Sequence, residues 1–277
     1  MSILADRLRR LRADAGLATR ASSQIDSSPP RADALRALLR VRNRARTALP
    51  APGGTEVAPG VRLVEWQCAW PAERWIALPL PDAPVVDRER LLCFDTETTG
   101  LAGGVGTRAF MIGVAAWRAQ QLHVRQLYLT SIAGEAAMLA LFADWLREDT
   151  ILASYNGKCY DAPLLKGRLR LNRIAHRLDA LPHVDWLHPT RRMYRGVYEN
   201  CRLATIERHA LGIVREDDLP GSEAPAAWLA FLRGQSSRNL ARVIEHNRQD
   251  VVTLMRLGEH LCARTTAAED DRSETSA

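Results

Sequence analysis

The chain has 277 residues and is 47% hydrophobic, which is enough apolar material for one sizeable domain with extensions or two small domains, and excludes a disordered protein. No apolar run approaches the roughly 18 residues of a membrane helix, and the N-terminus lacks the apolar core of a secretory signal, so we expect a soluble protein. The five cysteines form neither a CxxC pair nor a disulfide framework, which favours a reducing, cytoplasmic setting.

The formal charge is unevenly distributed. Residues 1–50 contain eleven Arg, no Lys and four Asp, a net charge of +7, whereas the whole chain carries +6, so the other 227 residues sum to −1. Concentrated arginine suits a polyanion, because neutralised phosphates release counterions. A solubilising, partly helical arm explains these residues equally well, while Asp6 and Asp14 argue against an organelle transit peptide.

The first part of the chain is predicted to be accessory to the main domain. Residues 1–60 form a basic, Arg-rich extension in which two short amphipathic helices are separated by "SSQIDSSPP" and followed by "LPAPGGTEVAPG". Residues 61–87 contain short strand-like segments and are a lead-in. At the other end of the chain, residues 265–277 are expected to be a disordered tail.

Residues 88–264 show regular secondary-structure signals. Three strands come first, and helices then alternate with strands: "RLLCFDT", "RAFMIGVAAW", "LHVRQLYLT", a helix in "GEAAMLALFADWLRE", a buried strand in "TILASYN", a helix from "DAPLLKGRLRLN", a strand in "PHVDWLHP", helices in "LATIERHALG" and "SEAPAAWLAFLRG", and a closing helix over 237–263. This order predicts an α/β domain with a mixed sheet flanked by helices.

Asp95 and Glu97 stand at the end of the first of these strands. Alternate residues of a strand share a face, so both carboxylates point the same way and could hold one or two divalent cations. The alternative is a strand-end turn in which Asp and Thr cap the backbone.

The closing helix carries a further acid on its apolar side. At 100° per residue its apolar residues form a stripe about 100° wide that should pack on the sheet. Asp250 falls within this stripe and His246 at its edge, one turn earlier. An unpaired carboxylate there would cost several kcal/mol and therefore needs a cation or a donor cluster. The alternatives are a buried ion pair between Asp250 and an arginine, and a packed histidine.

Asp161 stands where a helix begins, just after a buried strand that ends at Tyr155. It could cap that helix or face the strand ends from which Asp95 and Glu97 emerge. Four acids and a histidine would suit two divalent ions about 3.5–4 Å apart, which activate water and stabilise a leaving oxygen. Oxygen ligands favour Mg²⁺ or Mn²⁺, and His246 would be the general base.

Three segments then resemble a known superfamily. "FDTETTGL", "YNGKCYDAPLL" and "HNRQDV", in this order, look like the three exonuclease motifs of the DEDD (DnaQ-like) 3′→5′ exonucleases, and "REDDLPGSEAPAAWLAFLRG" and "DWLHPTRR" resemble the YprB-like branch. The resemblance covers residues 88–262. It implies an RNase H-like fold with three antiparallel strands plus parallel strands. His246 stands four residues before Asp250, the spacing of the tyrosine-type enzymes, whereas the histidine-type enzymes use five.

The resemblance implies that Asp95, Glu97, Asp161 and Asp250 bind the metal ions, that His246 is the base, and that nucleotides are removed from a 3′ end of DNA or RNA. The substrate is expected to be a single-stranded end. Substrate-binding candidates are Thr98, Tyr155, Asn156, Arg191 and Arg192, although a turn and a solvated surface explain these residues as well.

Two other classes of function stay open. One is a non-catalytic nucleic-acid-binding or scaffold module on the same fold, and the other is a metal-dependent phosphohydrolase for small nucleotides.

Overall fold

The computed structural model describes residues 50–80, 82–100 and 106–275. The helices and the linker expected before residue 50 lie outside these residues. The described residues form one compact unit. No described helix combines the length and the apolar content that crossing a membrane requires.

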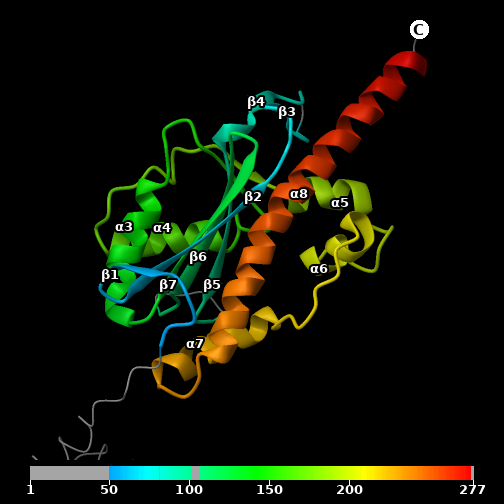
Figure 1. Ribbon diagram of the computed structural model, residues 1–277. Helices are drawn as coiled ribbons and strands as arrows, with labels where there is room; N and C mark the ends of the chain where they lie inside the picture. Colours follow the sequence, from blue (N-terminus) through cyan, green and yellow to red (C-terminus); the bar gives the residue numbers. More distant parts are fainter. Residues whose placement is uncertain (1–49, 81, 101–105, 276–277) are drawn as a thin grey trace, which may run out of the picture. The chain divides into compact units, whose positions relative to one another are not determined.

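A seven-stranded mixed sheet organises this unit (Figure 1). The strand order is β1-β2-β7-β6-β5-β8-β9, where β5 pairs in parallel with β8, β8 in parallel with β9, and all other neighbours are antiparallel. The strands are β1 (Thr55–Ala58), β2 (Val61–Ala69), β5 (Leu91–Thr98), β6 (Ala109–Arg118), β7 (Gln121–Leu129), β8 (Ile151–Ser154) and β9 (His183–Asp185). The expected mixed α/β architecture is thereby confirmed.

Two short strands, β3 (Trp75–Ala77) and β4 (Val85–Asp87), form a separate antiparallel pair. The helices are α3 (Glu135–Asp144), α4 (Asp161–Leu171), α5 (Leu187–Tyr194), α6 (Leu203–Ile206), α7 (Ala224–Leu232) and α8 (Arg238–Thr275). One turn of π-helix, Glu207–Leu211, continues α6 and ends at Gly212, whose φ is +65°.

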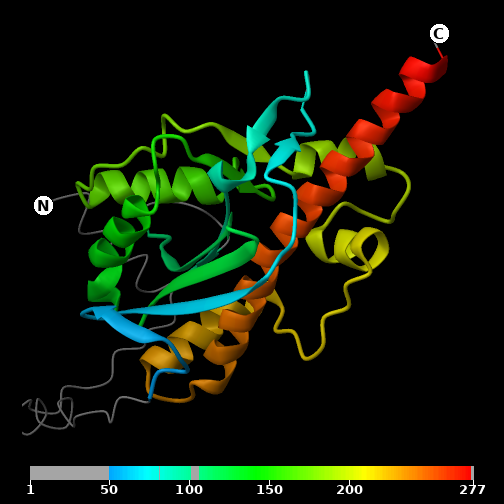
Figure 2. The same ribbon diagram turned by 45° about the horizontal axis from the view of Figure 1, so that its top comes forward.

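Helices cover both faces of the sheet (Figure 2). One core cluster joins the sheet to α3, α4, α7 and the start of α8, and the other joins it to α5, α6 and the rest of α8. Strand β5 is apolar on both sides because it lies between these clusters: Phe94 faces the first and Cys93 the second. Asp95 and Glu97 continue the Cys93 side, so they point toward α8.

The apolar stripe of α8 is buried as expected: Leu240, Val243, Leu254, Leu257 and Leu261 are each at most 1% exposed. The helix continues to Thr275, so the backbone of residues 265–275 is helical where a disordered tail was expected. This segment contains Ala, Glu and Arg but no Gly or Pro that would end a helix.

The boundary of the domain also differs from the expectation. Strand β1 lies within the expected extension 1–60, and β2, in the expected lead-in, is a full nine-residue strand of the main sheet. β2 pairs with β7, which lies some sixty residues later in the sequence. The sequence pattern of β2 alone does not show which strand it pairs with.

Candidate metal centre and active site

Two carboxylates enter the site from the carboxyl end of β5. Glu97 is only 8% exposed and Asp95 is half-buried, and both lie on the side of the sheet covered by α8. Asp95 Oδ2 accepts a hydrogen bond of 2.9 Å from Asn247 Nδ2 of α8. The strand end thus presents acids to a helix from a distant part of the sequence.

Helix α8 supplies the other half of the site. Glu97, His246 and Asp250 each place one ligand atom within 4.8 Å of the ligand atoms of the other two. His246 and Asp250 are one turn apart on the same face, with 3.3 Å between His246 Nε2 and Asp250 Oδ2. Two carboxylates and an imidazole therefore form a group that could hold a divalent cation.

Asp161 joins the site from the first turn of α4, as expected, but lies outside this group of three. Its Oδ1 accepts a hydrogen bond from the hydroxyl of Thr96, which points to the side of β5 opposite Asp95. Asp161 and Asp95 line one cavity of about 500 Å³. Asp95, His246 and Asp250 line a second cavity of about 270 Å³. Asp95 is therefore common to both.

The acids repel one another strongly. Burial, together with repulsion from Asp250 and Asp161, raises the pKa of Asp95 and of Glu97 well above their ordinary values. Burial also raises the pKa of Asp161. A divalent cation would neutralise these partly desolvated carboxylates, which have too little positive charge around them. Their oxygen atoms are ligands that fit Mg²⁺ or Mn²⁺.

One cation is nevertheless built into the site. Arg215 Nη2 lies 2.5 Å from Asp250 Oδ1 and 2.7 Å from Glu207 Oε1, and its Nε lies 2.7 Å from Glu207 Oε2. Glu207 is 1% exposed and also accepts from the Thr253 hydroxyl. Although burial opposes it, the bonds to Glu207 and Asp250 raise the pKa of Arg215, so the guanidinium stays charged. The alternative considered for Asp250, a buried ion pair with an arginine, is therefore present, and Asp250 also lies in the group with Glu97 and His246.

Asn247 was not among the residues predicted from the sequence. It is fully buried, and besides donating to Asp95 its Oδ1 accepts from Gln126 Nε2 of β7 at 2.9 Å. Gly113 of β6, the cross-strand partner of Asp95, makes room for it, because a Cβ there would lie 2.1 Å from Asn247 Oδ1. A glycine within an apolar strand and an asparagine beside the core-facing stripe were the available signals.

The expected substrate-binding residues have separate locations. Thr98 donates to the Gly100 carbonyl at 3.0 Å, and Asn156, with φ +65°, donates its backbone N–H to Asp185; both line the 500 Å³ cavity. Tyr155 lines both cavities and donates to the Cys201 carbonyl. Arg192 instead donates to the Pro79 carbonyl at 2.7 Å, which ties it to the β3–β4 segment.

Arg191 lies in a hollow of its own. It lines a cavity of about 480 Å³ with Arg195 and Arg202, and Cys201 connects this cavity to Tyr155. Among the residues that the structure describes, these three guanidinium groups have no hydrogen-bond or ion-pair partner. They form an unpaired basic surface next to the acidic site.

Comparison with known proteins places this site in a family context. Residues 92–262 match RNase_H_2, a family of the RNase_H superfamily. The chain belongs to the RNase_H superfamily. The matched segment begins in β5 and ends in α8, so it includes every acid of the site.

One relative and one solved structure add to this assignment. The chain is 37% identical over 178 residues to "Uncharacterized protein YprB" of Bacillus subtilis (strain 168), a match that covers 63% of this chain and 42% of YprB. The fold is similar to that of the family B DNA polymerase from the hyperthermophilic archaeon Pyrobaculum calidifontis, with a TM-score of 0.51 at 14% identity, over 92% of this chain and 34% of the polymerase. The chain thus spans less than half of either protein.

Proposed function

We propose that the chain is a DEDD-type, metal-dependent 3′→5′ exonuclease that hydrolyses the phosphodiester bonds of single-stranded nucleic acid. One observation carries the proposal: Glu97 of β5 converges with Asp250 and His246 of α8 to within 4.8 Å, beside Asp95. A module that only binds nucleic acid has no use for several buried acids that repel a polyanion.

Asp95, Glu97, Asp161 and Asp250 would hold two Mg²⁺ or Mn²⁺ ions, which supply an activated water and charge stabilisation of the leaving oxygen. His246 Nε2 is the base that takes the proton of the attacking water. The water oxygen forms a bond to phosphorus, the bond from phosphorus to the 3′-oxygen of the preceding nucleotide breaks, and that oxygen takes a proton from solvent. Asn247 holds the carboxylate of Asp95 in place during this hydrolysis.

The surroundings of the site favour a polynucleotide over a small ester. The exposed ring of Tyr160 lines the 500 Å³ cavity and offers a face on which a base can stack. Beyond Tyr155, the surface of Arg191, Arg195 and Arg202 is suited to backbone phosphates. We therefore propose that the strand runs from this cavity across Tyr155 to the three arginines.

The test is degradation of single-stranded DNA and RNA oligonucleotides labelled at the 5′ end or the 3′ end, with Mg²⁺, Mn²⁺ or EDTA. Wild type is expected to shorten the 5′-labelled strand stepwise, and Asp95→Ala and EDTA to abolish the ladder. Asp179→Ala is the matched control, because Asp179 is an exposed acid paired with Lys166 and Arg170 on α4.

A scaffold that binds nucleic acid without cutting it is the second candidate, favoured by the Arg215–Asp250 pair, which already neutralises one acid. It predicts binding with no cleavage under any metal. A small-nucleotide phosphohydrolase would instead hydrolyse mononucleotide esters as fast as oligonucleotides, so both substrates belong in the assay.

A further inference from the structure

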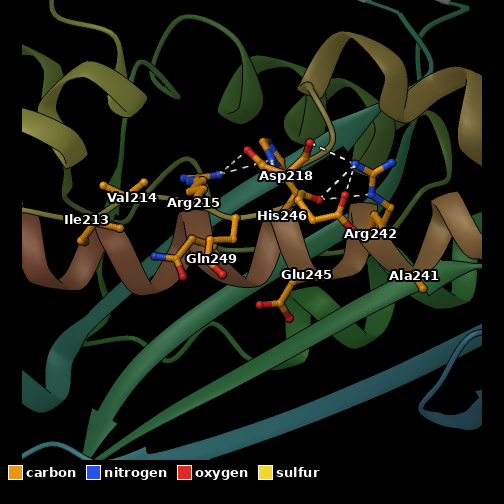
Figure 3. A pocket seen from close by; sticks show the side chains of 11 residues that line it. Ile213, Val214, Arg215, Asp218, Ala241, Arg242, Glu245, His246 and Gln249 are labelled. Atoms are coloured by element: carbon orange, nitrogen blue, oxygen red, sulfur yellow. Dashed lines mark hydrogen bonds and ion pairs between the residues drawn. The ribbon is translucent and has the colours of Figure 1, made fainter.

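Residues 213–218 form a third wall of the site. With α8, this segment lines a cavity of about 540 Å³ next to the acid group (Figure 3). Arg215 and Asp218 of the segment also line the 270 Å³ cavity that contains Asp95 and Asp250. The segment therefore contacts the reaction centre directly, although none of its residues was predicted to take part.

The imidazole of His246 has two neighbours from this segment at the same nitrogen. Asp218 Oδ1 lies 2.6 Å from His246 Nδ1, and Arg215 Nη1 lies 3.3 Å from it. The contact to the Asp218 carboxylate is short, whereas the contact to the Arg215 guanidinium is long. Asp218 therefore decides whether Nδ1 donates or accepts a hydrogen bond. A carboxylate oxygen only accepts, so this contact is a hydrogen bond if Nδ1 carries the ring hydrogen, and we assign the hydrogen to Nδ1 on that ground.

The position of the ring hydrogen determines whether the other nitrogen, Nε2, can accept a proton. When Nδ1 of a neutral imidazole carries the hydrogen, Nε2 has a free lone pair. His246 Nε2 lies 3.3 Å from Asp250 Oδ2, on the side of the acid group. A lone pair there is ready to accept a proton from a water bound at that position.

We propose that Asp218 is a positioning residue: through His246 Nδ1 it sets the tautomer and the orientation that direct the Nε2 lone pair into the active site. The proposal rests on the proposed nuclease function and deepens it. Asp218 gives His246 Nδ1 a carboxylate partner from outside α8.

The backbone that presents Asp218 is itself held by α8. Arg242 donates to the carbonyl of Asp217 at 3.1 and 3.2 Å and to the carbonyl of Asp218 at 3.2 Å. Asp217 has φ +50°, a conformation that few residues other than Gly, Asn and Asp adopt readily. Arg242 and His246 are one turn apart on α8, so a single helix fixes both ends of the contact between Asp218 and His246.

The competing interpretation is that Asp218 merely ties the segment to α8. Loss of its carboxylate would then lower stability but change neither the tautomer of His246 nor the chemical step. Spectroscopy and kinetics separate these cases.

The first experiment is two-bond ¹H–¹⁵N NMR of the histidine side chains in metal-free protein, at a pH at which the ring is neutral. His246→Gln identifies the signal among the seven histidines. We expect the Nδ1–H tautomer in wild type and its conversion to Nε2–H or to a mixture in Asp218→Ala. An Nε2–H ring in wild type, or an unchanged ring in the variant, overturns the proposal. This readout needs no activity, so its failure is distinct from a failure of the nuclease assignment.

The second experiment is the kinetics of the full chain. We expect Asp218→Ala to lower kcat at least about tenfold, with KM changed less than about twofold, because a general base contributes roughly 10²–10⁴-fold. Asp218→Ala,His246→Gln should be no slower than His246→Gln, whereas additive losses would show that Asp218 acts elsewhere.

Two further variants keep the kinetic test decisive. Asp218→Asn preserves the shape of the side chain, so it replaces Asp218→Ala if that variant unfolds. The kcat of Asp218→Asn should lie between those of wild type and Asp218→Ala. A kcat equal to that of wild type contradicts the proposal. Asp179→Asn alters an exposed carboxylate that pairs with Lys166 and Arg170 and lines none of the three cavities of the site, so it should retain wild-type kcat.

Discussion

Nη2 of Arg215 lies 2.5 Å from Oδ1 of Asp250, so the last acid of the site has a cation partner before any metal ion binds. The arginine is held on its other side by two bonds to the buried Glu207. One positive charge thus lies between two carboxylates; it also acts to lower the pKa of Glu97, but burial and repulsion from the other acids outweigh it. Arg215 fixes the side chain of Asp250, and the remaining excess of negative charge is what a divalent cation would neutralise.

Asp250→Asn should abolish turnover and leave the fold intact. Asparagine can still accept from Arg215, but it removes a metal-binding charge, and we expect a loss of at least about 10³-fold in kcat/KM. The measurement is oligonucleotide degradation beside a thermal melt, in which Tm should stay within a few degrees of wild type. Asp179→Asn should retain full activity. Activity in Asp250→Asn would remove this residue from the mechanism.

The pH dependence of stability should reveal the acid group in metal-free protein. Burial and repulsion raise the pKa of Asp95 in the folded state, so its contribution to stability is present below its unfolded pKa of about 4 and is lost as the pH rises through the folded pKa. In EDTA, the Tm of wild type should therefore fall as the pH rises from about 4.

Asp95→Asn should flatten this decline and melt several degrees above wild type at neutral pH, since ~1 kcal/mol corresponds to about 2–4 °C in a domain of this size. Asp149→Asn is the control: Arg147 lowers the pKa of this exposed carboxylate, so its loss should give no gain in Tm. Parallel curves for wild type and Asp95→Asn would mean that Asp95 is not repelled as the geometry indicates.

Addition of Mn²⁺ or Mg²⁺ should reverse the instability of the acid group. A ligand at 100 times its Kd stabilises the folded state by ~2.7 kcal/mol, so Tm should rise by roughly 5–10 °C and fall again with EDTA. Asp95→Asn and Asp250→Asn should each lose most of this rise, because each removes one of the converging charges. An equal rise in wild type and both variants would show that the ions bind elsewhere.

The parts of the site that sequence reasoning found are those that follow a local period. Asp95 and Glu97 share a strand face, because side chains alternate every two residues along a strand. Asp250 lies in the apolar stripe of α8, because side chains of a helix repeat every 3.6 residues. The side of each element to which these acids point could therefore be predicted from the sequence. For Asp161 the expected start of a helix left a cap and a site acid open, and the resemblance to the second exonuclease motif made it a candidate ligand.

The residues that sequence reasoning missed reach the site through long-range packing. Arg215 and Asp218 belong to an irregular segment with no period, and only the folded chain brings them to His246 and Asp250. Strand β2 has an alternating burial pattern that reads as a strand, but its partner β7 is set by the whole sheet. The domain boundary at residue 60 was misplaced for the same reason.

Replacement of Arg191, Arg195 and Arg202 by glutamine should weaken binding of single strands without impairing the chemistry. Each phosphate contact contributes about 0.7 to the slope of log K against log salt, so the slope should fall by about 2. The measurement is binding at several salt concentrations in the Asp250→Asn background, with kcat on a dinucleotide in the active background, where no change is expected.

The matched control replaces three exposed arginines that have carboxylate partners: Arg147, Arg170 and Arg177. This triple variant should leave the salt slope nearly as it is. If both triple variants lower the salt slope equally, the nucleic-acid strand does not bind preferentially at the cavity lined by Arg191, Arg195 and Arg202.

Deletion of residues 1–46 should weaken nucleic-acid binding while Tm and the dinucleotide rate stay unchanged. This segment carries eleven Arg and four Asp, and it falls outside the compact unit that begins at Thr47. Deletion of residues 1–60 should behave differently, because it also removes β1 and the Gly53 carbonyl that accepts from Arg62 and Tyr128. We expect a lower Tm only in the longer deletion, and a reduced salt slope in both. A salt slope unchanged by removal of residues 1–46 would refute a role of these arginines in polyanion binding, whatever the longer deletion does to stability.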